Sequence, residues 1–283
     1  MSPEPAQYKE EQRQQWGKAA EAWGRWHEPF SQMSCDATEA IIDAAELAAG
    51  MQVLDLACGS GEPSLTVAEL VGPSGGVVAS DLAQEMVAVI KANVTKRGLT
   101  NVTCQQIDAE SIPFPDESFD RVTCRFGVMF FPEPAKGLRE VCRVLKPGGR
   151  AALTAWAPPE VNPFFSAPGG VLLQHGLLTL PPPDAPNVFR FAQEGSLAAA
   201  MEEAGFQQVS ERQQRIAWRW PAGFDDFWEW FWQGGMPFRS AIENAAPERR
   251  QTVIDGLRAA FRQFEKAGGL DFGATIVVAS GVR

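Results

Sequence analysis

The sequence contains few of the residues that bind metals or form disulfide frameworks. Among its 283 residues there are two histidines, His27 and His175, and five cysteines without a C-x-x-C pair. Structural zinc sites need four such ligands at regular spacing, so we expect no metal site. The odd number of cysteines, several of them inside expected strands or helices, indicates buried thiols in a reducing cytoplasm rather than disulfides.

Positive charge and long apolar runs are also scarce. The 25 Lys and Arg residues are outnumbered by 35 Asp and Glu residues, which gives a formal net charge of −10 and a pI of about 4.9. An acidic chain without a basic stripe is a poor partner for nucleic acid, so we expect none. No apolar run reaches the ~20 residues that a membrane-spanning helix needs. Because residues 1–11 are polar and do not resemble a signal peptide, we expect a cytoplasmic protein without an integral membrane segment.

One stretch of the chain organises the rest of the sequence. Hydrophobic residues make up 45% of the chain, enough for one large core. Residues 53–56 are an expected buried strand, Gly59 and Gly61 follow in a tight turn, and Pro63 suits the first position of a helix. Strand, glycine turn and helix in this order open a nucleotide-binding α/β unit.

The residues around the glycine turn disfavour a phosphate ligand. A pyrophosphate cofactor needs free N–H groups at the N-terminus of the helix. Here Glu62 places a negative charge at that point, Pro63 removes a donor, and Ser64 replaces the third glycine of G-x-G-x-x-G. A cofactor with a ribose, an adenine and a cationic centre but no phosphate fits these residues better, and S-adenosylmethionine has that chemistry.

Carboxylates end three successive expected strands, at Asp55, Asp81 and Asp108. Ligands of open α/β sheets bind at this edge, and an acid about 20 residues beyond the glycine turn typically holds the ribose hydroxyls. Asp81 stands at that position. Its alternative role is to cap a helix over residues 83–97.

Five motifs lie between residues 53 and 156, at 53–61, 81–86, 108–110, 114–120 and 139–149. Together they resemble class I S-adenosylmethionine-dependent methyltransferases, and specifically the ubiquinone/menaquinone biosynthesis C-methyltransferase-like group. The resemblance implies an α/β fold with a Rossmann-like seven-stranded sheet, parallel with an antiparallel last strand, and helices on both faces.

The same resemblance implies a set of cofactor-binding residues around the glycine turn and the next two strand ends. Gly59 and Gly61 would lie against the methionine part and the ribose, and Asp81 would hold the ribose hydroxyls. The full set is Asp55, Ala57, Gly59, Gly61, Asp81, Leu82, Met86, Asp108, Ala109 and Arg125.

The remaining members of this set have more specific implied roles. Asp108 and Ala109 would meet the adenine edge, and backbone near Arg125 would contact the methionine amino group. Asp55 would orient the glycine turn or reach that amino group. Ala57 stands where many members of the group have their first glycine.

The rest of the chain divides around this core. The expected parts are an N-terminal helical lid (1–50), an S-adenosylmethionine-binding core (51–157), an active-site cover (158–190) and the C-terminal part of the core (191–283) with an aromatic helical insertion (221–268). The proline-rich cover is too long for an ordinary loop. The last two strands of the core are expected at residues 209–220 and 271–282.

The first aromatic stretch outside the motifs is an expected helix over residues 8–30. Its Trp16, Trp23 and Trp26 fall on one helical face. That face either packs on the core or forms a lid whose rings attract a sulfonium cation, and both can hold together.

The second aromatic stretch opens the C-terminal insertion. Phe224, Phe227, Trp228 and Phe231 are expected on one helical face, with Trp230 and Trp232 elsewhere on the helix. This face would pack in the core, line a hydrophobic substrate site or form the contact of a homodimer.

The implied reaction is in-line transfer of a methyl group from a sulfonium to carbon, oxygen or nitrogen. Alignment supplies much of the acceleration, and a phenol or amine acceptor also gains from a general base, for which His175 and His27 are the candidates. We predict a methyltransferase acting on a hydrophobic small molecule, with C-methylation of a quinone-like ring favoured over O- or N-methylation. The alternatives are a non-catalytic regulatory protein that binds S-adenosylmethionine or S-adenosylhomocysteine, and a dinucleotide oxidoreductase.

Overall fold

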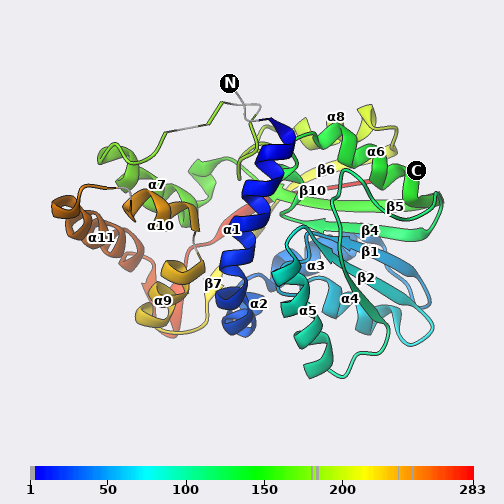
Figure 1. Ribbon diagram of the computed structural model, residues 1–283, viewed down its shortest axis with the longest axis horizontal. Coiled ribbons are helices and arrows are strands. Elements are labelled where there is room, and N and C mark those ends of the chain that lie inside the picture. Colours follow the sequence, from blue (N-terminus) through cyan, green and yellow to red (C-terminus); the bar gives the residue numbers. More distant parts are fainter. Residues whose placement is uncertain (1–3, 180, 183–184, 235, 244) are drawn as a thin grey trace.

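A seven-stranded sheet forms the centre of the protein. The computed structural model describes residues 4–179, 181–182, 185–234, 236–243 and 245–283 (Figure 1). The sheet has the order β3-β2-β1-β4-β5-β10-β6. Its strands are β1 (Gln52–Leu56), β2 (Gly76–Asp81), β3 (Val102–Gln106), β4 (Phe119–Arg125), β5 (Leu145–Trp156), β6 (Gln207–Ile216) and β10 (Ala274–Val282). Neighbouring strands from β3 to β5 are parallel, and β10 is antiparallel to β5 and β6, which confirms the predicted sheet.

Helices cover both faces of the sheet, as predicted (Figure 1). One face carries α3 (Cys35–Ala45), α4 (Ser64–Val71) and α5 (Gln84–Lys96), and the other carries α6 (Pro134–Val144) and α8 (Ser196–Glu203). Successive strand residues point to opposite faces. Val53 of β1 accordingly packs with Val67 and Val71 of α4, whereas Leu54 joins the largest cluster together with Leu138 of α6.

The N-terminal segment forms two helices where the sequence predicted one over residues 8–30. The first, α1 (Pro5–Arg25), ends before Trp26, and α2 (His27–Met33) follows. At this break the Trp26 indole donates to Gln233 Oε1 (3.2 Å) and contacts the ring of Trp220 (5.9 Å). The docking of Trp26 on a distant part of the chain therefore takes it off the face that carries Trp16 and Trp23.

A small second sheet changes the last two predicted strands. Its order is β7-β9-β8, formed by β7 (Arg219–Trp220), β9 (Gly269–Asp271) and β8 (Glu265–Lys266). The predicted strand 209–220 stops at Ile216, because the next amide, of Ala217, donates to the carboxylate of Asp36 in α3 (2.7 Å) instead of to a strand. The predicted strand 271–282 likewise begins at Ala274.

The C-terminal insertion and the cover segment form a group of helices beside the sheet, with α1 running between them and the core (Figure 1). The short turns η1 (Val128–Phe130) and η2 (Pro159–Val161) precede α6 and α7. The helices of the group are α7 (Pro163–Gln174), α9 (Phe224–Gly234), α10 (Met236–Glu243) and α11 (Pro247–Arg262). The largest apolar cluster runs without interruption from Leu54 in the sheet to Phe227 of α9 and Phe261 of α11.

The buried face of α9 differs from the predicted one. Phe224, Phe227 and Phe231 are buried as expected, but Trp230 is buried with them (4% exposed) and Trp228 is only partly buried. Trp230 stacks on Trp220 of the small sheet, with ring centroids 4.9 Å apart. The helix packs against partners on two sides, so its buried stripe is wider than one helical face.

Candidate active site

The glycine turn after β1 holds three residues in the left-handed region. Ala57 (φ 55°), Gly59 (φ 54°) and Gly61 (φ 138°) all have positive φ. A Cβ on Gly61 would lie 2.7 Å from Leu65 Cδ1 of α4 and 2.8 Å from Ile90 Cδ1 of α5, so this glycine lets the turn pack against both helices. A Cβ on Gly59 would meet nothing within 4 Å, so that side of the turn is open to a ligand.

Asp55 lies beneath this turn and is fully buried. Its carboxylate accepts hydrogen bonds from the hydroxyls of Ser64 and Thr123 (2.7 Å from Thr123 Oγ1). Burial raises the pKa of Asp55 to about 6, although these two hydrogen bonds oppose the shift. Asp55 therefore ties β1 to β4 and to the start of α4, under the glycine turn.

Asp81 joins the glycine turn to the end of β2. Its Oδ2 accepts from the Gly59 amide and its Oδ1 from the Ala83 amide, both at 3.0 Å. The carboxylate is 8% exposed, and burial raises its pKa against the effect of these amides. Asp81 is not the N-cap of α5, because the helix begins at Gln84 with Ala83 at the N-cap position and no side-chain cap. Its carboxylate instead fixes the glycine turn against the segment that leads into α5.

Glu62 occupies the N-terminus of α4, which begins at Ser64, one residue later than predicted. Its buried carboxylate accepts from Thr66 Oγ1 (2.7 Å) and from the Thr66 amide (3.3 Å), and it pairs with Arg97 (3.1 Å). A phosphate at this end of the helix would be repelled by the Glu62 carboxylate. One of the backbone N–H groups that could bind it, that of Thr66, already donates to Glu62. The geometry supports the exclusion of a pyrophosphate cofactor.

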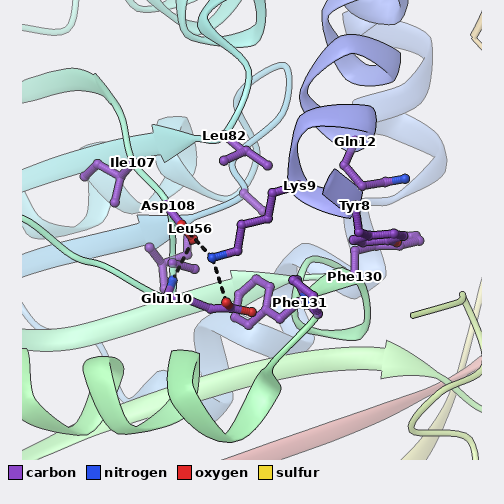
Figure 2. Close-up of a pocket in the computed structure, with 13 residues that line it drawn as sticks. Tyr8, Lys9, Gln12, Leu56, Leu82, Ile107, Asp108, Glu110, Phe130 and Phe131 are labelled. Atoms are coloured by element: carbon purple, nitrogen blue, oxygen red, sulfur yellow. Dashed lines mark hydrogen bonds and ion pairs between the residues drawn. The ribbon is translucent and has the colours of Figure 1, made fainter. Parts of the chain in front are cut away.

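A small cavity lies where α1 crosses the carboxyl edge of the sheet (Figure 2). Its volume is about 60 Å³, whereas ligand pockets typically measure ~300–1,000 Å³. Four predicted cofactor-binding residues line it: Ala57, Leu82, Asp108 and Ala109. The other lining residues are Leu56, Ile107, Glu110, Phe130, Phe131 and Pro132 from the core, and Tyr8, Lys9 and Gln12 from α1.

Lys9 reaches from α1 into this cavity and contacts two carboxylates. Its Nζ lies 2.7 Å from Asp108 Oδ2 and 2.7 Å from Glu110 Oε2 (Figure 2). Burial lowers the pKa of Lys9, but the hydrogen bonds to both acids outweigh that effect and the pKa is raised. Lys9 is therefore charged. Beside it, burial raises the pKa of Tyr8 to about 12, which keeps the phenol neutral.

The two predicted general bases lie in different parts of the molecule. His27 begins α2 and is 4% exposed; its Nδ1 lies 3.1 Å from Ser60 Oγ in the glycine turn. Its Nε2 has no hydrogen-bond partner among the described residues, and burial lowers its pKa. His175 lies at the far end of α7, where its carbonyl accepts from Arg249 of α11 (2.7 Å). The structure does not bring His175 together with the other predicted residues.

Two further predicted residues support the site from outside the cavity. Met86 is 1% exposed and packs with Ala19 and Ala20 of α1. The Arg125 guanidinium points to the junction of α2 and α3, where it donates to Ser34 Oγ (2.7 Å) and Thr38 Oγ1 (3.0 Å). Both residues hold the N-terminal helices on the core.

Metal ligands and membrane spans are not evident in the described part of the chain. There, no group of three or more His, Cys, Asp and Glu residues is placed to hold a metal ion. Of the helices in the same residues, none is both long and apolar enough to cross a membrane. All five cysteines are free; Cys58 and Cys124 are buried as expected, but Cys35 is exposed.

Comparison with known proteins shows the family to which this chain belongs. The sequence pattern of the "ubiE/COQ5 methyltransferase family" matches residues 33–168. The chain is 34% identical over 178 residues to the ubiquinone/menaquinone biosynthesis C-methyltransferase UbiE of Escherichia fergusonii, a match that covers 59% of this chain and 71% of that one. The UbiE enzyme of Proteus mirabilis is also 34% identical, over 182 residues, with 60% and 71% coverage.

A solved structure extends the similarity beyond the central motifs. YcgJ from Bacillus subtilis superposes with a TM-score of 0.56 at 26% identity, over 88% of this chain and 98% of that one. The order of the sheet, the glycine turn and the sequence similarity all indicate the same family. The chain belongs to the ubiE/COQ5 methyltransferase family, and it is an S-adenosylmethionine-dependent methyltransferase.

Proposed function

We propose that the protein methylates a carbon atom of a planar, hydrophobic, quinone-type acceptor. The observation that carries this proposal is a cluster of aromatic rings where β4 and β5 end. Phe126 stacks on Trp156 with ring centroids 4.3 Å apart, and Trp218 stands edge-on to both (6.2 and 4.9 Å). The names of the UbiE relatives, which are quinone-biosynthesis C-methyltransferases, support the same acceptor class.

Three residues give the cofactor its expected place. Gly59 leaves an open side against the turn, and each carboxylate oxygen of Asp81 retains a lone pair for a ribose hydroxyl beyond the amide it already accepts. Asp108 lines the cavity, and the resemblance implies that it meets the adenine edge. These residues fit S-adenosylmethionine, which supplies a methyl group on a positively charged sulfur. Glu62 at the helix end disfavours a dinucleotide.

The aromatic cluster suits an acceptor that is flat and carries oxygen. Phe126 directly follows β4 and adopts φ 60°, a strained conformation for a bulky residue, of the kind that concentrates at functional sites. Trp218 is 1% exposed, and its indole N–H has no hydrogen-bond partner among the described residues. A quinone-type oxygen would accept from this N–H while its ring stacks on the neighbouring aromatics. We place the acceptor there, beneath the cover segment that contains α7.

For His27 we propose a positioning role. Its Nδ1 contact with Ser60 links α2 to the glycine turn, and its buried ring faces the turn itself. His27→Gln should weaken S-adenosylhomocysteine binding and leave the pH profile of kcat unchanged; a lost limb of that profile would instead support the predicted general base. For His175, the cytoplasmic location, the absence of a nucleic-acid partner and the homodimer, the sequence predictions stay predictions.

The test is calorimetric titration followed by an acceptor screen. Wild-type protein should bind S-adenosylmethionine and S-adenosylhomocysteine, and Asp81→Ala should weaken both by about tenfold or more, since it removes two oxygen acceptors. NADH serves as the control ligand. Short-chain naphthoquinols and benzoquinols should then yield a product whose new methyl group is on a ring carbon, located by NMR.

The outcomes separate the alternatives. A methyl group found on oxygen or nitrogen would replace C-methylation with O- or N-methylation. Binding of both adenosyl ligands without methylation of any quinol, phenol or amine would favour a regulatory protein. If neither ligand binds, the proposed function is wrong.

A further inference from the structure

Arg125 carries a positive charge without a counter-ion among the described residues. It ends β4, directly before Phe126 of the aromatic cluster, and it forms no ion pair in the part of the chain that the structure describes. Burial lowers its pKa, whereas the charges of Glu62 and Asp55 oppose that shift. Both acids are engaged elsewhere, because Asp55 accepts from two hydroxyls and Glu62 pairs with Arg97. A charge removed from water without a partner is costly, and a negatively charged ligand would supply that partner.

The guanidinium of Arg125 uses only one of its three nitrogens to hold the fold. Nη1 donates to the Ser34 hydroxyl (2.7 Å), the Thr38 hydroxyl (3.0 Å) and the Ser34 carbonyl (3.4 Å). Nε and Nη2 have no hydrogen-bond partner among the described residues, and the side chain is partly exposed. The N–H bonds of these two nitrogens lie along one edge of the planar group, the edge that binds anionic oxygen. That edge is available to a ligand.

Arg121 on the same strand shows how an arginine with a purely structural role is satisfied. Like Arg125, it faces α3. Its Nε donates to the Ala45 carbonyl (2.6 Å), its Nη1 to the Asp120 carbonyl (2.8 Å) and its Nη2 to the Glu46 carbonyl (3.2 Å). All three nitrogens of Arg121 are used for the fold, whereas Arg125 keeps two in reserve. Attachment of α3 to the sheet therefore does not explain the free edge of Arg125.

Phe30 of α2 connects this guanidinium with the aromatic cluster. Its ring centroid lies 6.0 Å from Arg125 Cζ, in cation–π contact, and 6.0 Å from the ring of Trp218, which stands edge-on to it. Phe30, Arg125 and Phe126 are each partly exposed, although all three lie where β4 ends against α2 and α3. Arg125 is thereby a charged group adjoining the place proposed for the acceptor.

A phenolate is the anion that suits both this guanidinium and the proposed reaction. Methylation of a ring carbon needs electron density at that carbon, and an ionised hydroxyl on the neighbouring carbon supplies it. A cation beside the oxygen favours the ionised form and so lowers the pKa of the hydroxyl. A guanidinium stays charged at neutral pH, so it can act in this way throughout the working range of the enzyme.

We propose that Arg125 binds a hydroxyl of the acceptor as a phenolate, through Nε and Nη2, and so selects acceptors with an ionisable hydroxyl beside the methylated carbon. The inference rests on the proposed function. The hydroxyl proton goes to water. The phenolate electrons then form the bond from the ring carbon to the methyl carbon, the bond from the methyl carbon to sulfur breaks, and the sulfur keeps its electron pair. The ring carbon finally loses its hydrogen to water as a proton, which restores the aromatic phenolate.

The first experiment measures the ionisation of a bound phenol. 4-Nitrophenol, whose phenolate absorbs visible light, is titrated with pH in the presence of saturating S-adenosylhomocysteine and wild type, Arg125→Gln or Thr38→Val. Wild type should lower the pKa of the bound phenol by about one unit or more, and Arg125→Gln should abolish this shift because it removes the charge. Thr38→Val removes one contact of Nη1 but keeps the free edge, so it should match wild type.

The second experiment separates the acceptor from the cofactor, whose methionine carboxylate is another anion. Arg125→Gln should raise KM for a naphthoquinol by about tenfold or more, through the loss of charge-assisted hydrogen bonds, and should leave the Kd of S-adenosylhomocysteine unchanged. Arg125→Lys keeps the charge without the paired donors and should recover part of the pKa shift. Thermal unfolding of each variant confirms that it is folded.

Three results would overturn the inference and leave the proposed function intact. The first is a wild type that does not bind the phenolate in preference to the neutral phenol, absence of binding included. The second is an equal effect of Arg125→Gln and Thr38→Val, which would leave Arg125 a structural role only. The third is weaker binding of S-adenosylhomocysteine to Arg125→Gln with the pKa of the bound phenol unchanged, which would assign the free edge to the cofactor. Failure of wild type to bind either adenosyl ligand would instead contradict the proposed function.

Discussion

Gly59 and Gly61 lie two residues apart, yet the structure requires glycine at each for a different reason. Gly61 is surrounded by Leu65 and Ile90, and its φ of 138° is one that other residues avoid. Gly59 has the same φ region as Ala57 and open space beside it. Gly61 is therefore required by the packing of the fold, whereas Gly59 leaves an open space in which we propose that the cofactor lies.

Alanine at each position should separate these roles. Gly61→Ala should lower the free energy of unfolding by about 2–4 kcal/mol, from overpacking and backbone strain. Gly59→Ala should lower it by only about 1 kcal/mol, because a left-handed alanine is strained but not crowded. Urea unfolding measures both changes.

Ligand titration should show a large effect at Gly59, although its alanine variant is the less destabilised of the two. Gly59→Ala should bind S-adenosylhomocysteine roughly tenfold or more weakly, because its methyl group fills the space left for the cofactor. A Gly59→Ala protein that binds like wild type would show that the cofactor does not lie against this residue.

Asp55 predicts a pH dependence whose sign follows from its burial. Its pKa rises from 3.8 to about 6 on folding, so the folded state holds this proton more tightly than the unfolded chain does. Its contribution to stability is therefore full below about pH 4 and is lost as the pH rises through about 6. Asp55→Asn has no proton to lose.

The stability of Asp55→Asn relative to wild type should accordingly increase by about 2–3 kcal/mol between pH 4 and pH 7. Urea unfolding of the two proteins across this range gives the difference, in which the titration of all other groups cancels. A difference that does not change with pH would mean that Asp55 titrates alike in both states.

At the scale of elements, two buried tryptophans test the place of the acceptor. Trp218 and Trp220 are each 1% exposed, and neither indole N–H has a hydrogen-bond partner among the described residues. Trp218 contacts Phe126 at the end of β4, whereas Trp220 lies in β7 against Trp230 of α9.

Trp218→Phe should raise KM for a quinol by about fivefold to tenfold through the loss of one hydrogen bond, with the Kd of S-adenosylhomocysteine unchanged. Trp220→Phe makes the same chemical change away from the acceptor and should leave KM unaltered. Steady-state kinetics of both variants checks the prediction. Equal effects on KM would point to a general loosening of the aromatic core.

The elements that the sequence predicted well are those specified by local signals. The glycine turn and the strands that end near Asp55 and Asp81 follow from apolar runs and glycines within a few positions of one another. The break in the last predicted strand depends instead on Ala217 and Asp36, which are 181 residues apart. A pattern of neighbouring residues in the sequence does not predict such a contact.

The same limit explains what was missed in the site. Asp108 and Ala109, which line the cavity, could be predicted as site residues because their motif is short and follows a strand. Lys9 is one charged residue among many on a polar helix, and only its contact with Asp108, 99 residues away, distinguishes it. Trp230 was misplaced because α9 packs on two sides, which a single helical stripe does not predict.

At the scale of the whole molecule, one continuous apolar cluster joins the sheet to the helices beside it. Phe227 sits inside this junction, fully buried, with the rings of Phe261 and Phe272 at 4.9 and 5.3 Å. The helical group has a small apolar cluster of its own, formed by Leu172, Ile242, Val253 and Leu257. Because Phe227 and Phe261 also belong to the cluster of the sheet, we expect the group to unfold together with the sheet.

Phe227→Ala should lower the free energy of unfolding of the entire protein by about 3–5 kcal/mol. Far-ultraviolet circular dichroism, which reports on helices, and near-ultraviolet circular dichroism, which reports on aromatic packing, should show one coincident transition in urea. Leu173→Ala, at an exposed position of α7, is the control and should change stability by less than about 0.5 kcal/mol. Two separate transitions would indicate an independent helical unit.

The aromatic contacts of α1 also give the protein an internal optical reporter. Trp16 stands edge-on to Phe130, a residue of the cavity wall, with ring centroids 6.1 Å apart, and it packs against Trp23 at 5.7 Å. Any movement of α1 away from the cavity changes the surroundings of this indole, while Trp218 and Trp220 stay in the core. Ligand entry should therefore alter the tryptophan fluorescence of the unlabelled protein, and Trp16→Phe should reduce that signal, with Trp23 of the same helix supplying the remainder.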